Sequence, residues 1–323
     1  MAGVSCACLI FSTTFDRRAP LRECAVRIWG FRGPLGAFIA AWGGIAMLTS
    51  APFDDWWHNA YGLDVKILSP PHTVLAAGMI AVEAGSLILI LGQMNRAAGE
   101  MRERLERMFL YVAGMMVVGL MALLLEYTYR VLLHTGRTYR VIATVIPLVL
   151  AGVSRASGRR WPATTVAGVY TAFLVALVWI LPRFAAEPKL GPVYYQVKQF
   201  VPNGFPILLL APALALDLLW RRTPDWNRWA LAAVSGAVFV AVLVTAQWPF
   251  ADFLMSPGAR NWVFGAHYFD YDTRPDSYIA RSLFYPLETP AQLRFELALA
   301  VAAATLSARA GLGWGEWMRR IRR

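Results

Sequence analysis

Long apolar runs with almost no charge dominate this chain and limit what it can fold into. The clearest run, residues 72–93, reads HTVLAAGMIAVEAGSLILILGQ, and Glu83 is the one Asp, Glu, Lys or Arg residue in it. An α-helix of about 20 mainly apolar residues is needed to cross the hydrocarbon core of a bilayer. Only 16% of the whole chain is charged, whereas soluble domains carry about 25%. The sequence therefore predicts an all-α, multi-pass membrane protein whose main surroundings are the lipid bilayer.

Eight apolar segments are long enough to be interpreted as membrane spans. They cover residues 33–51, 72–93, 107–127, 139–154, 163–182, 204–220, 229–248 and 291–309. We expect three regions: an N-terminal arm over residues 1–32, a transmembrane bundle over 33–311 and a basic tail over 312–323. Within the bundle, residues 52–72 and the longest connection, residues 249–290, are expected on the outer side.

The distribution of basic residues predicts the orientation of these spans. With the N-terminus inside, 20 of the 31 Lys and Arg residues fall on inner segments. Cytoplasmic segments of membrane proteins are enriched in Lys and Arg, so we expect both termini in the cytoplasm and the chain in the cytoplasmic (inner) membrane. The net charge of +11 then reflects topology. No polar segment interleaves aromatic and basic residues, and nucleic acid is not an expected partner.

The outer segment PFDDWWHNAYGLDVKILSPPH, residues 52–72, gathers carboxylates and imidazoles at the edge of the bilayer. Asp54 and His58 are four residues apart and share a face if this stretch is helical. His72 opens the second span, after two prolines that end any preceding helix. One carboxylate and two imidazoles suit copper, and they equally suit zinc or non-haem iron. The sequence predicts a metal site made of Asp54, His58 and His72.

Other residues of this segment have accessory or purely structural interpretations. Asp55 and Asp64 are candidates to orient an imidazole N–H of the site. In the alternative interpretation, all of these side chains are solvated loop residues. Trp56 and Trp57 are then ordinary anchors at the membrane interface.

Glu83 is a candidate functional residue inside the second span. It follows His72 by eleven residues, which is about three helical turns and nearly the same face. An ionisable side chain within a span is costly and indicates function by default. The alternative is a carboxyl that forms a hydrogen bond to a neighbouring helix.

Two further histidines lie in expected outer segments. Glu126, Arg130 and His134 follow one another in steps of four and share a face if the helix continues through them. A structural ion pair capped by His134 is favoured there over a second metal site. His267, in the 249–290 connection, is a candidate extra ligand for the first site. The alternative is a docking loop held by its own ion pairs.

Residues 52–72 resemble the C subunit of the copper membrane monooxygenases, the particulate methane and ammonia monooxygenase family. That subunit carries Asp-x-x-x-His with Trp before the His, a following Asp, and Thr-Pro-x-His at the start of a helix. The matching residues here are Asp54, Trp57, His58, Asp64 and Ser69-Pro70-Pro71-His72. The resemblance implies that Asp54, His58 and His72 are copper ligands. It is confined to this segment, its histidines are separated by one residue more than in the family pattern, and the second metal site of the family has no match.

Three functions remain open from the sequence. The first is a copper-dependent monooxygenase subunit that activates O₂ to oxidise a small apolar substrate, with other subunits as partners. The second, favoured equally, is a non-catalytic protein that handles copper or helps to assemble a metalloenzyme. The third is a proton-coupled transporter that uses Glu83. The chain has no P-loop, G-x-S-x-G, G-x-G-x-x-G or H-E-x-x-H motif that would indicate another chemistry.

Overall fold

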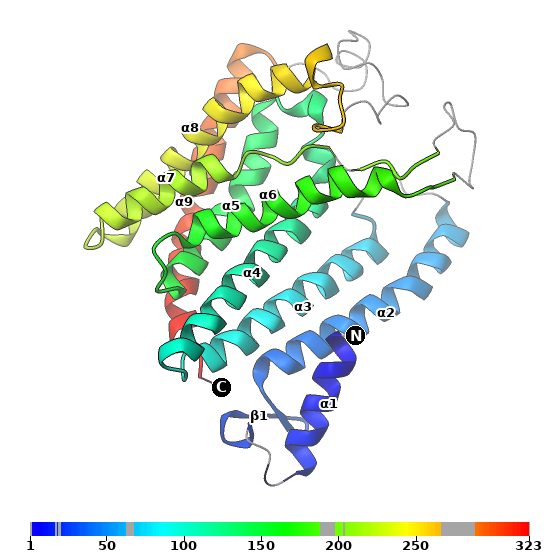
Figure 1. The fold of residues 1–323 in the computed structure, drawn as a ribbon, viewed down its shortest axis with the longest axis vertical. Helices are drawn as coiled ribbons and strands as arrows, with labels where there is room; N and C mark the ends of the chain where they lie inside the picture. The colour runs from blue at the N-terminus through cyan, green and yellow to red at the C-terminus, as the bar shows by residue number, and fades with distance from the viewer. Residues whose placement is uncertain are drawn as a thin grey trace. The chain divides into compact units, whose positions relative to one another are not determined.

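The computed structural model describes residues 2–16, 18, 21–62, 68–187, 198–202, 204–265 and 288–322, and this part of the chain is largely helical (Figure 1). The α-helices are α1 (Ala2–Phe15), α2 (Leu35–Tyr61), α3 (Pro70–Met94), α4 (Gly99–Leu123), α5 (Gly136–Ala156), α6 (Pro162–Ile180), α7 (Leu210–Arg222), α8 (Arg228–Leu254) and α9 (Pro290–Arg320). Among the residues described, seven helices are long and apolar enough to cross a membrane: α2 to α6, α8 and α9. These helices confirm the prediction of an all-α, multi-pass membrane protein. The number of spans and the side on which the termini lie stay predictions.

The chain forms two compact units. The first comprises Met1–Leu123, Gly152–Arg159 and Gly313–Arg323, and the second comprises Leu124–Ala151 and Arg160–Leu312. In the first unit, α2, α3 and α4 run side by side (Figure 1). The second unit contains α6, α7, α8 and most of α5 and α9.

Glycines allow α2 and α3 to pack backbone against backbone. Gly36 and Gly43 on α2 have the same spacing of seven as Gly78 and Gly85 on α3. A Cβ atom added to Gly43 would come within 2.6 Å of the Gly78 carbonyl oxygen, and one added to Gly85 within 2.5 Å of the Gly36 carbonyl oxygen. Small residues permit such close approach between helices in a membrane. The pairing of Gly36 with Gly85 and of Gly43 with Gly78 makes the helices antiparallel, so the end of α2 lies beside the start of α3.

The N-terminal arm is a folded element that packs on α2. Cys6 and Ile10 of α1 form a buried apolar cluster with Ala37 and Ala40 of α2. After α1 the chain forms a two-stranded antiparallel hairpin, β1 (Val26–Ile28) and β2 (Phe31–Gly33). Because this hairpin leads directly into α2, the arm and the first long helix form one continuous packed structure.

In the second unit, the segment expected to span over residues 204–220 differs from a continuous helix. The helix α7 has only 13 residues and reaches about 20 Å, which is short of a hydrocarbon core of about 30 Å. Pro206 explains the late start, because proline lacks an N–H and disfavours helix in the residue before it. Pro212 is accommodated because it lies in the first turn of α7, where the N–H has no intrahelical partner in any case.

The chain before α7 is held along α6 by hydrogen bonds. The Phe200 N–H donates to the Phe184 carbonyl oxygen at 3.1 Å, and the Ile207 N–H donates to the Tyr170 hydroxyl at 3.1 Å. At the other end of α6, the Asp217 carboxylate accepts from the Thr164 N–H at 2.8 Å. The described part of residues 200–222 therefore runs antiparallel to α6, without helix in its first part and helical from Leu210 onward.

Buried polar side chains satisfy this non-helical backbone. Tyr170 and Gln247 are each 1% exposed. Tyr170 accepts from Ile207 as above, and the Gln247 Oε1 accepts from the Leu208 N–H at 2.9 Å. Buried backbone N–H groups need acceptors, and these two side chains supply them where residues 207 and 208 leave the helical conformation.

Several helices extend beyond the expected spans. The first long helix, α2, continues from the expected end at residue 51 to Tyr61, α8 continues to Leu254, and α9 continues to Arg320. The 249–290 connection therefore begins after α8, and residues 266–287 of it lie outside the described residues. The extension of α2 matters most, because it places Asp54 and His58 on a helix.

Candidate metal centre

Asp54 and His58 lie on the last turns of α2. Pro52 has no N–H to continue the helical ladder, yet the helix persists through this point. Nearby hydroxyls bond to backbone carbonyls of the same helix: the Thr49 Oγ1 donates to the Ile45 oxygen at 3.0 Å and the Ser50 Oγ to the Met47 oxygen at 2.7 Å. Since the helix is maintained, Asp54 and His58 are one turn apart on one face.

His72 approaches the same carboxylate from α3. The Asp54 Oδ1 lies 3.5 Å from the His58 Nε2 and 3.5 Å from the His72 Nε2. Helical side chains lean toward the N-terminus of their own helix. In this antiparallel pair, Asp54 therefore leans back along α2 while His72 leans away from the body of α3, and the two side chains meet. The structure brings together the three residues predicted from the sequence.

The tautomer of His58 makes this contact chemically informative. The His58 Nδ1 lies 2.9 Å from the Gly62 carbonyl oxygen, which can only accept, so Nδ1 carries the hydrogen. In a neutral ring the Nε2 then has a lone pair and no hydrogen, and its neighbour at 3.5 Å is a carboxylate oxygen. Two lone-pair donors side by side are arranged to share a cation, such as a metal ion.

Burial and exposure complete the description of the site. The Asp54 Oδ1 is buried and accepts no hydrogen bond from the residues described. The three side chains are each about one-third exposed, at 33% for Asp54, 32% for His58 and 35% for His72. Across the part of the chain that the structure describes, no group of three or more His, Cys, Asp or Glu side chains is already arranged to hold a metal ion. The trio is centred on the Asp54 oxygen and is not a formed coordination sphere.

The accessory candidates have different placements. Asp55 is exposed, and its backbone carbonyl accepts from Asn59. The His58 Nδ1–H donates to the Gly62 carbonyl oxygen, an acceptor that was not among the expected carboxylates. Asp64 and His267 lie outside the described residues. Sequence reasoning missed Gly62, because a backbone acceptor leaves no mark in side-chain patterns.

Aromatic rings surround the end of α2. The Trp57 and Tyr61 ring centroids are 4.5 Å apart, and those of Phe53 and Trp56 are 5.9 Å apart. Trp56 is 54% exposed. Tryptophan and tyrosine are enriched at the level of the lipid headgroups, so this end of α2 has the composition of a membrane interface.

Glu83 is placed where the sequence predicted it, inside α3. Its carboxyl lies against Gly119 of α4: a Cβ atom added to Gly119 would come within 2.9 Å of the Glu83 Oε1. The Glu83 Oε2 is buried and has no hydrogen-bond partner among the residues described. The carboxyl therefore occupies a notch on α4 that exists because residue 119 has no side chain.

The expected shared face of Glu126, Arg130 and His134 is not formed. The helix α4 ends at Leu123, and two short 3-10 turns, η2 (Leu125–Tyr127) and η3 (Arg130–Leu132), follow. Threonine hydroxyls donate hydrogen bonds to backbone carbonyl oxygens where the helix ends. The Thr138 Oγ1 donates to the Tyr127 oxygen at 2.7 Å, and the Thr128 Oγ1 donates to the Leu124 oxygen. Side chains of this type compete with the helical ladder.

His134 instead pairs with α8 within the second unit. Its Nε2 lies 2.9 Å from the Asp252 Oδ1, and its ring meets Trp248 edge-on with centroids 4.9 Å apart. Asp252 was not singled out from the sequence, because a pair separated by more than one hundred residues leaves no local spacing to recognise. His134 thus contacts an acid on another helix, and the predicted ion pair of Glu126 with Arg130 stays a prediction.

No protein-family model, curated protein or solved structure matches this chain. The resemblance to the monooxygenase C subunit therefore rests on residues 52–72 alone.

Proposed function

We propose that this protein is a multi-pass membrane protein that binds copper between Asp54, His58 and His72. The observation that carries the proposal is the approach of two imidazole Nε2 atoms to one buried carboxylate oxygen, each at 3.5 Å. The Nδ1–H of His58 is already held by a backbone carbonyl, which is the usual arrangement of a histidine that binds metal through its other nitrogen.

Binding requires a small rearrangement of these side chains. Nitrogen and oxygen ligands lie about 2.0–2.2 Å from a bound zinc ion, and first-row metals of this kind share the same ligand set. Rotation of the imidazoles would move their Nε2 atoms from around the Asp54 oxygen to around a common ion. The one-third exposure of the three side chains leaves room for that movement and for a further ligand.

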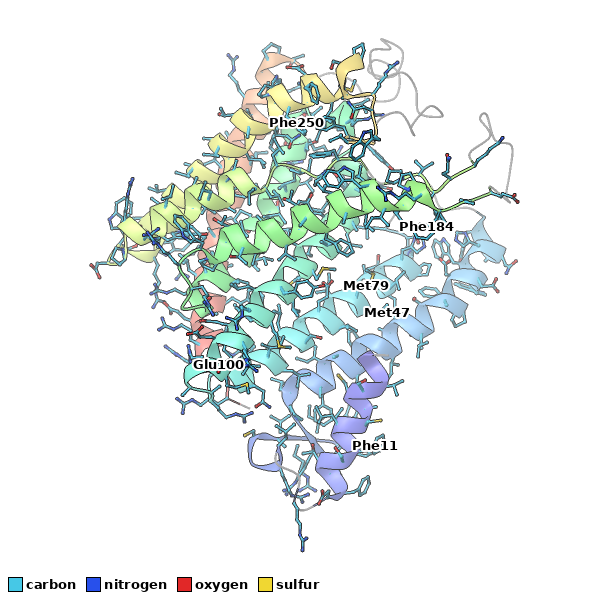
Figure 2. All side chains as sticks on the ribbon, in the orientation of Figure 1. Phe11, Met47, Met79, Glu100, Phe184 and Phe250 are labelled. Carbon is cyan, nitrogen blue, oxygen red and sulfur yellow. The ribbon has the colours of Figure 1, made fainter. Side chains whose placement is uncertain are left out.

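The distribution of basic residues between the two ends of the first unit supports an outer position for the metal site. At the end of the first unit away from the candidate metal site, α3 ends and α4 begins. The basic residues Arg96, Arg102 and Arg104 lie there, near Glu100, which is labelled in Figure 2. The Asn95 Nδ2 donates to the Met318 carbonyl oxygen at 2.9 Å, so the basic C-terminal end of α9 lies at this same end. Because basic ends face the cytoplasm, the metal site lies on the periplasmic side.

The orientation follows if the chain crosses eight times. Seven crossings are the long helices, and the eighth is the 200–222 segment, which accompanies α6. An even number puts both termini on the same side of the membrane, and the basic residues at that side make it the cytoplasmic side of the inner membrane. Discontinuous crossings of this kind occur where irregular backbone is buried in protein.

Two roles for bound copper remain, and one observation separates them. Copper supplies redox chemistry with O₂, as in the monooxygenase family that residues 52–72 resemble; the protein would then act as one subunit of a complex that oxidises a small apolar substrate. The exposure of all three ligands favours the second role, a site that receives and releases copper. In either role Asp54 supplies negative charge, and His58 and His72 supply neutral nitrogen donors.

The test is metal analysis of the full-length chain, purified in detergent with a tag that contains no histidine. The wild type is compared with Asp54→Asn, His58→Ala and His72→Ala after equal exposure to copper and zinc. Asp55→Asn and His134→Ala are matched controls that each remove a carboxylate or an imidazole outside the trio. The Cu(II) electron paramagnetic resonance spectrum reports nitrogen ligation.

Each outcome has a defined meaning. About one copper per chain that survives a chelator, and that each trio variant loses while both controls retain it, supports a resident ion. Copper bound at the same residues but removed by the chelator supports handling. Equal metal content in the wild type and all variants would overturn the site.

A further inference from the structure

We propose that Glu83 is a proton-binding site: a neutral carboxylic acid inside the membrane, held in the notch at Gly119. This inference does not depend on metal binding at the outer end of α2 and α3. It concerns a different residue, about three helical turns further along α3.

The stretches of helix that pack around Glu83 carry no counter-charge. In the first unit α3 packs on α2 and α4. Residues 36–53, 73–94 and 108–123 of these helices contain no Lys, Arg, His or Asp, and Glu83 is their only acidic residue. Tyr111 is their one other titratable side chain, and it is exposed. Along these stretches an ionised Glu83 would have no cation to pair with; the Arg and His residues of the three helices lie toward the helix ends, outside these ranges.

The carboxyl group of Glu83 lies where an ionised form would be poorly stabilised. The Oε2 atom is buried and without a hydrogen-bond partner among the residues described. The Oε1 atom lies at the bare backbone of Gly119. An isolated carboxylate in such surroundings costs far more than a neutral acid, so the group takes up a proton instead.

The notch at Gly119 has room for the carboxyl group only because residue 119 is a glycine. A side chain at residue 119 would overlap the carboxyl, because even a Cβ atom would lie within 2.9 Å of Oε1 and 3.2 Å of Oε2. The glycine therefore leaves space for a carboxyl group between α3 and α4. A proton is the ligand that fits, since it needs no further coordinating atoms.

Carbodiimide labelling tests this inference. A neutral carboxylic acid gives its proton to one nitrogen of dicyclohexylcarbodiimide while its oxygen bonds to the central carbon, so the adduct gains the mass of the whole reagent. The full-length protein in detergent is treated at about pH 8, where ordinary glutamates, with a pKa of about 4.3, are ionised. Peptide mass spectrometry then compares Glu83 with Glu100 and Glu103, which are exposed on α4.

Infrared spectroscopy gives a second readout that does not depend on access of a reagent. The wild type should have a carbonyl-stretch band of a protonated carboxyl that is sensitive to deuterium, and Glu83→Gln should lose it. Glu83→Asp and Gly119→Ala are companion variants, expected to retain the band at a shifted position. Glu83→Gln keeps the size and shape of the side chain, so loss of the band would not report unfolding.

The expected result is an adduct at Glu83 with at least tenfold higher occupancy than at Glu100 or Glu103, together with loss of the band in Glu83→Gln. Superimposable carbonyl regions in the wild type and Glu83→Gln, with no adduct at Glu83, would overturn the proposal. Neither readout involves copper, so failure of the metal site and failure of this site are distinguishable.

Discussion

The Asp54 Oδ1 lies 3.5 Å from the His72 Nε2 although the two residues are 18 positions apart and belong to different helices. The contact exists because α2 and α3 are antiparallel and pack through glycines, which leaves the end of one helix beside the start of the other. The arrangement of the candidate metal site therefore depends on how α2 and α3 pack against each other through their glycines.

Replacing Asp54 by Asn should weaken metal binding strongly while it changes the structure very little. The amide keeps the shape of the side chain but removes the negative charge shared by the two imidazoles. We expect copper affinity, measured by competition with a chelator, to fall by about 10–100-fold or more. Asp55→Asn should leave it within twofold, and an equal loss in both variants would contradict the assignment.

Replacing Gly85 by Ala should destabilise the first unit. The added methyl group would meet the Gly36 carbonyl oxygen at 2.5 Å, and overpacking of this kind costs about 1–3 kcal/mol. Unfolding by sodium dodecyl sulfate in mixed micelles measures the change. Gly92→Ala is the matched control on the same helix, where an added Cβ atom meets nothing within 4 Å, and it should be neutral or stabilising by up to about 1 kcal/mol. Equal stability of the two variants would argue against the close α2–α3 contact.

Replacing Gln247 by Leu should destabilise the second unit, because the Leu208 N–H loses its acceptor. A buried donor left without a partner costs about 1–3 kcal/mol. Thr245→Val on α8 is the control, since that hydroxyl bonds only to the Ala241 carbonyl of its own helix. The same denaturation assay applies, and a Gln247→Leu variant as stable as Thr245→Val would contradict the described path of residues 204–209.

The cysteines of α1 should differ in their reactivity. Cys6 is buried against α2 while Cys8 is exposed, and burial raises the pKa of the Cys6 thiol. A raised pKa means a smaller thiolate fraction at neutral pH, and the thiolate is the reactive form. Maleimide labelling of Cys6→Ser and Cys8→Ser variants, each with Cys24→Ser, should therefore show fast modification when Cys8 is present and slow modification when only Cys6 remains. Equal rates would show that α1 does not pack on α2 as described.

Helix existence and the membrane setting could be predicted because they depend on local composition. The run around Glu83 is apolar enough to require a helix in lipid whatever its neighbours are, and α3 begins within two residues of the expected start. The choice of Asp54, His58 and His72 as a group was also available, since Asp54 and His58 have helical spacing and His72 follows two prolines. Glu126, Arg130 and His134 would share a face only if a helix continued through them, and this condition is not met, because α4 ends at Leu123 and threonine hydroxyls bond to the backbone carbonyls there.

Contacts between residues that are far apart in the chain could not be predicted from the sequence. Spacing along a chain reports which side chains share a face, but it contains no information on which carbonyl or carboxylate another helix will present. The partners Gly62 for His58, Gly119 for Glu83, and Asp252 for His134 became visible only once the helices were packed. The apolar character of each segment is thus a property of its own residues, whereas the protonation and ligand chemistry of the few polar ones is a property of their neighbours in space.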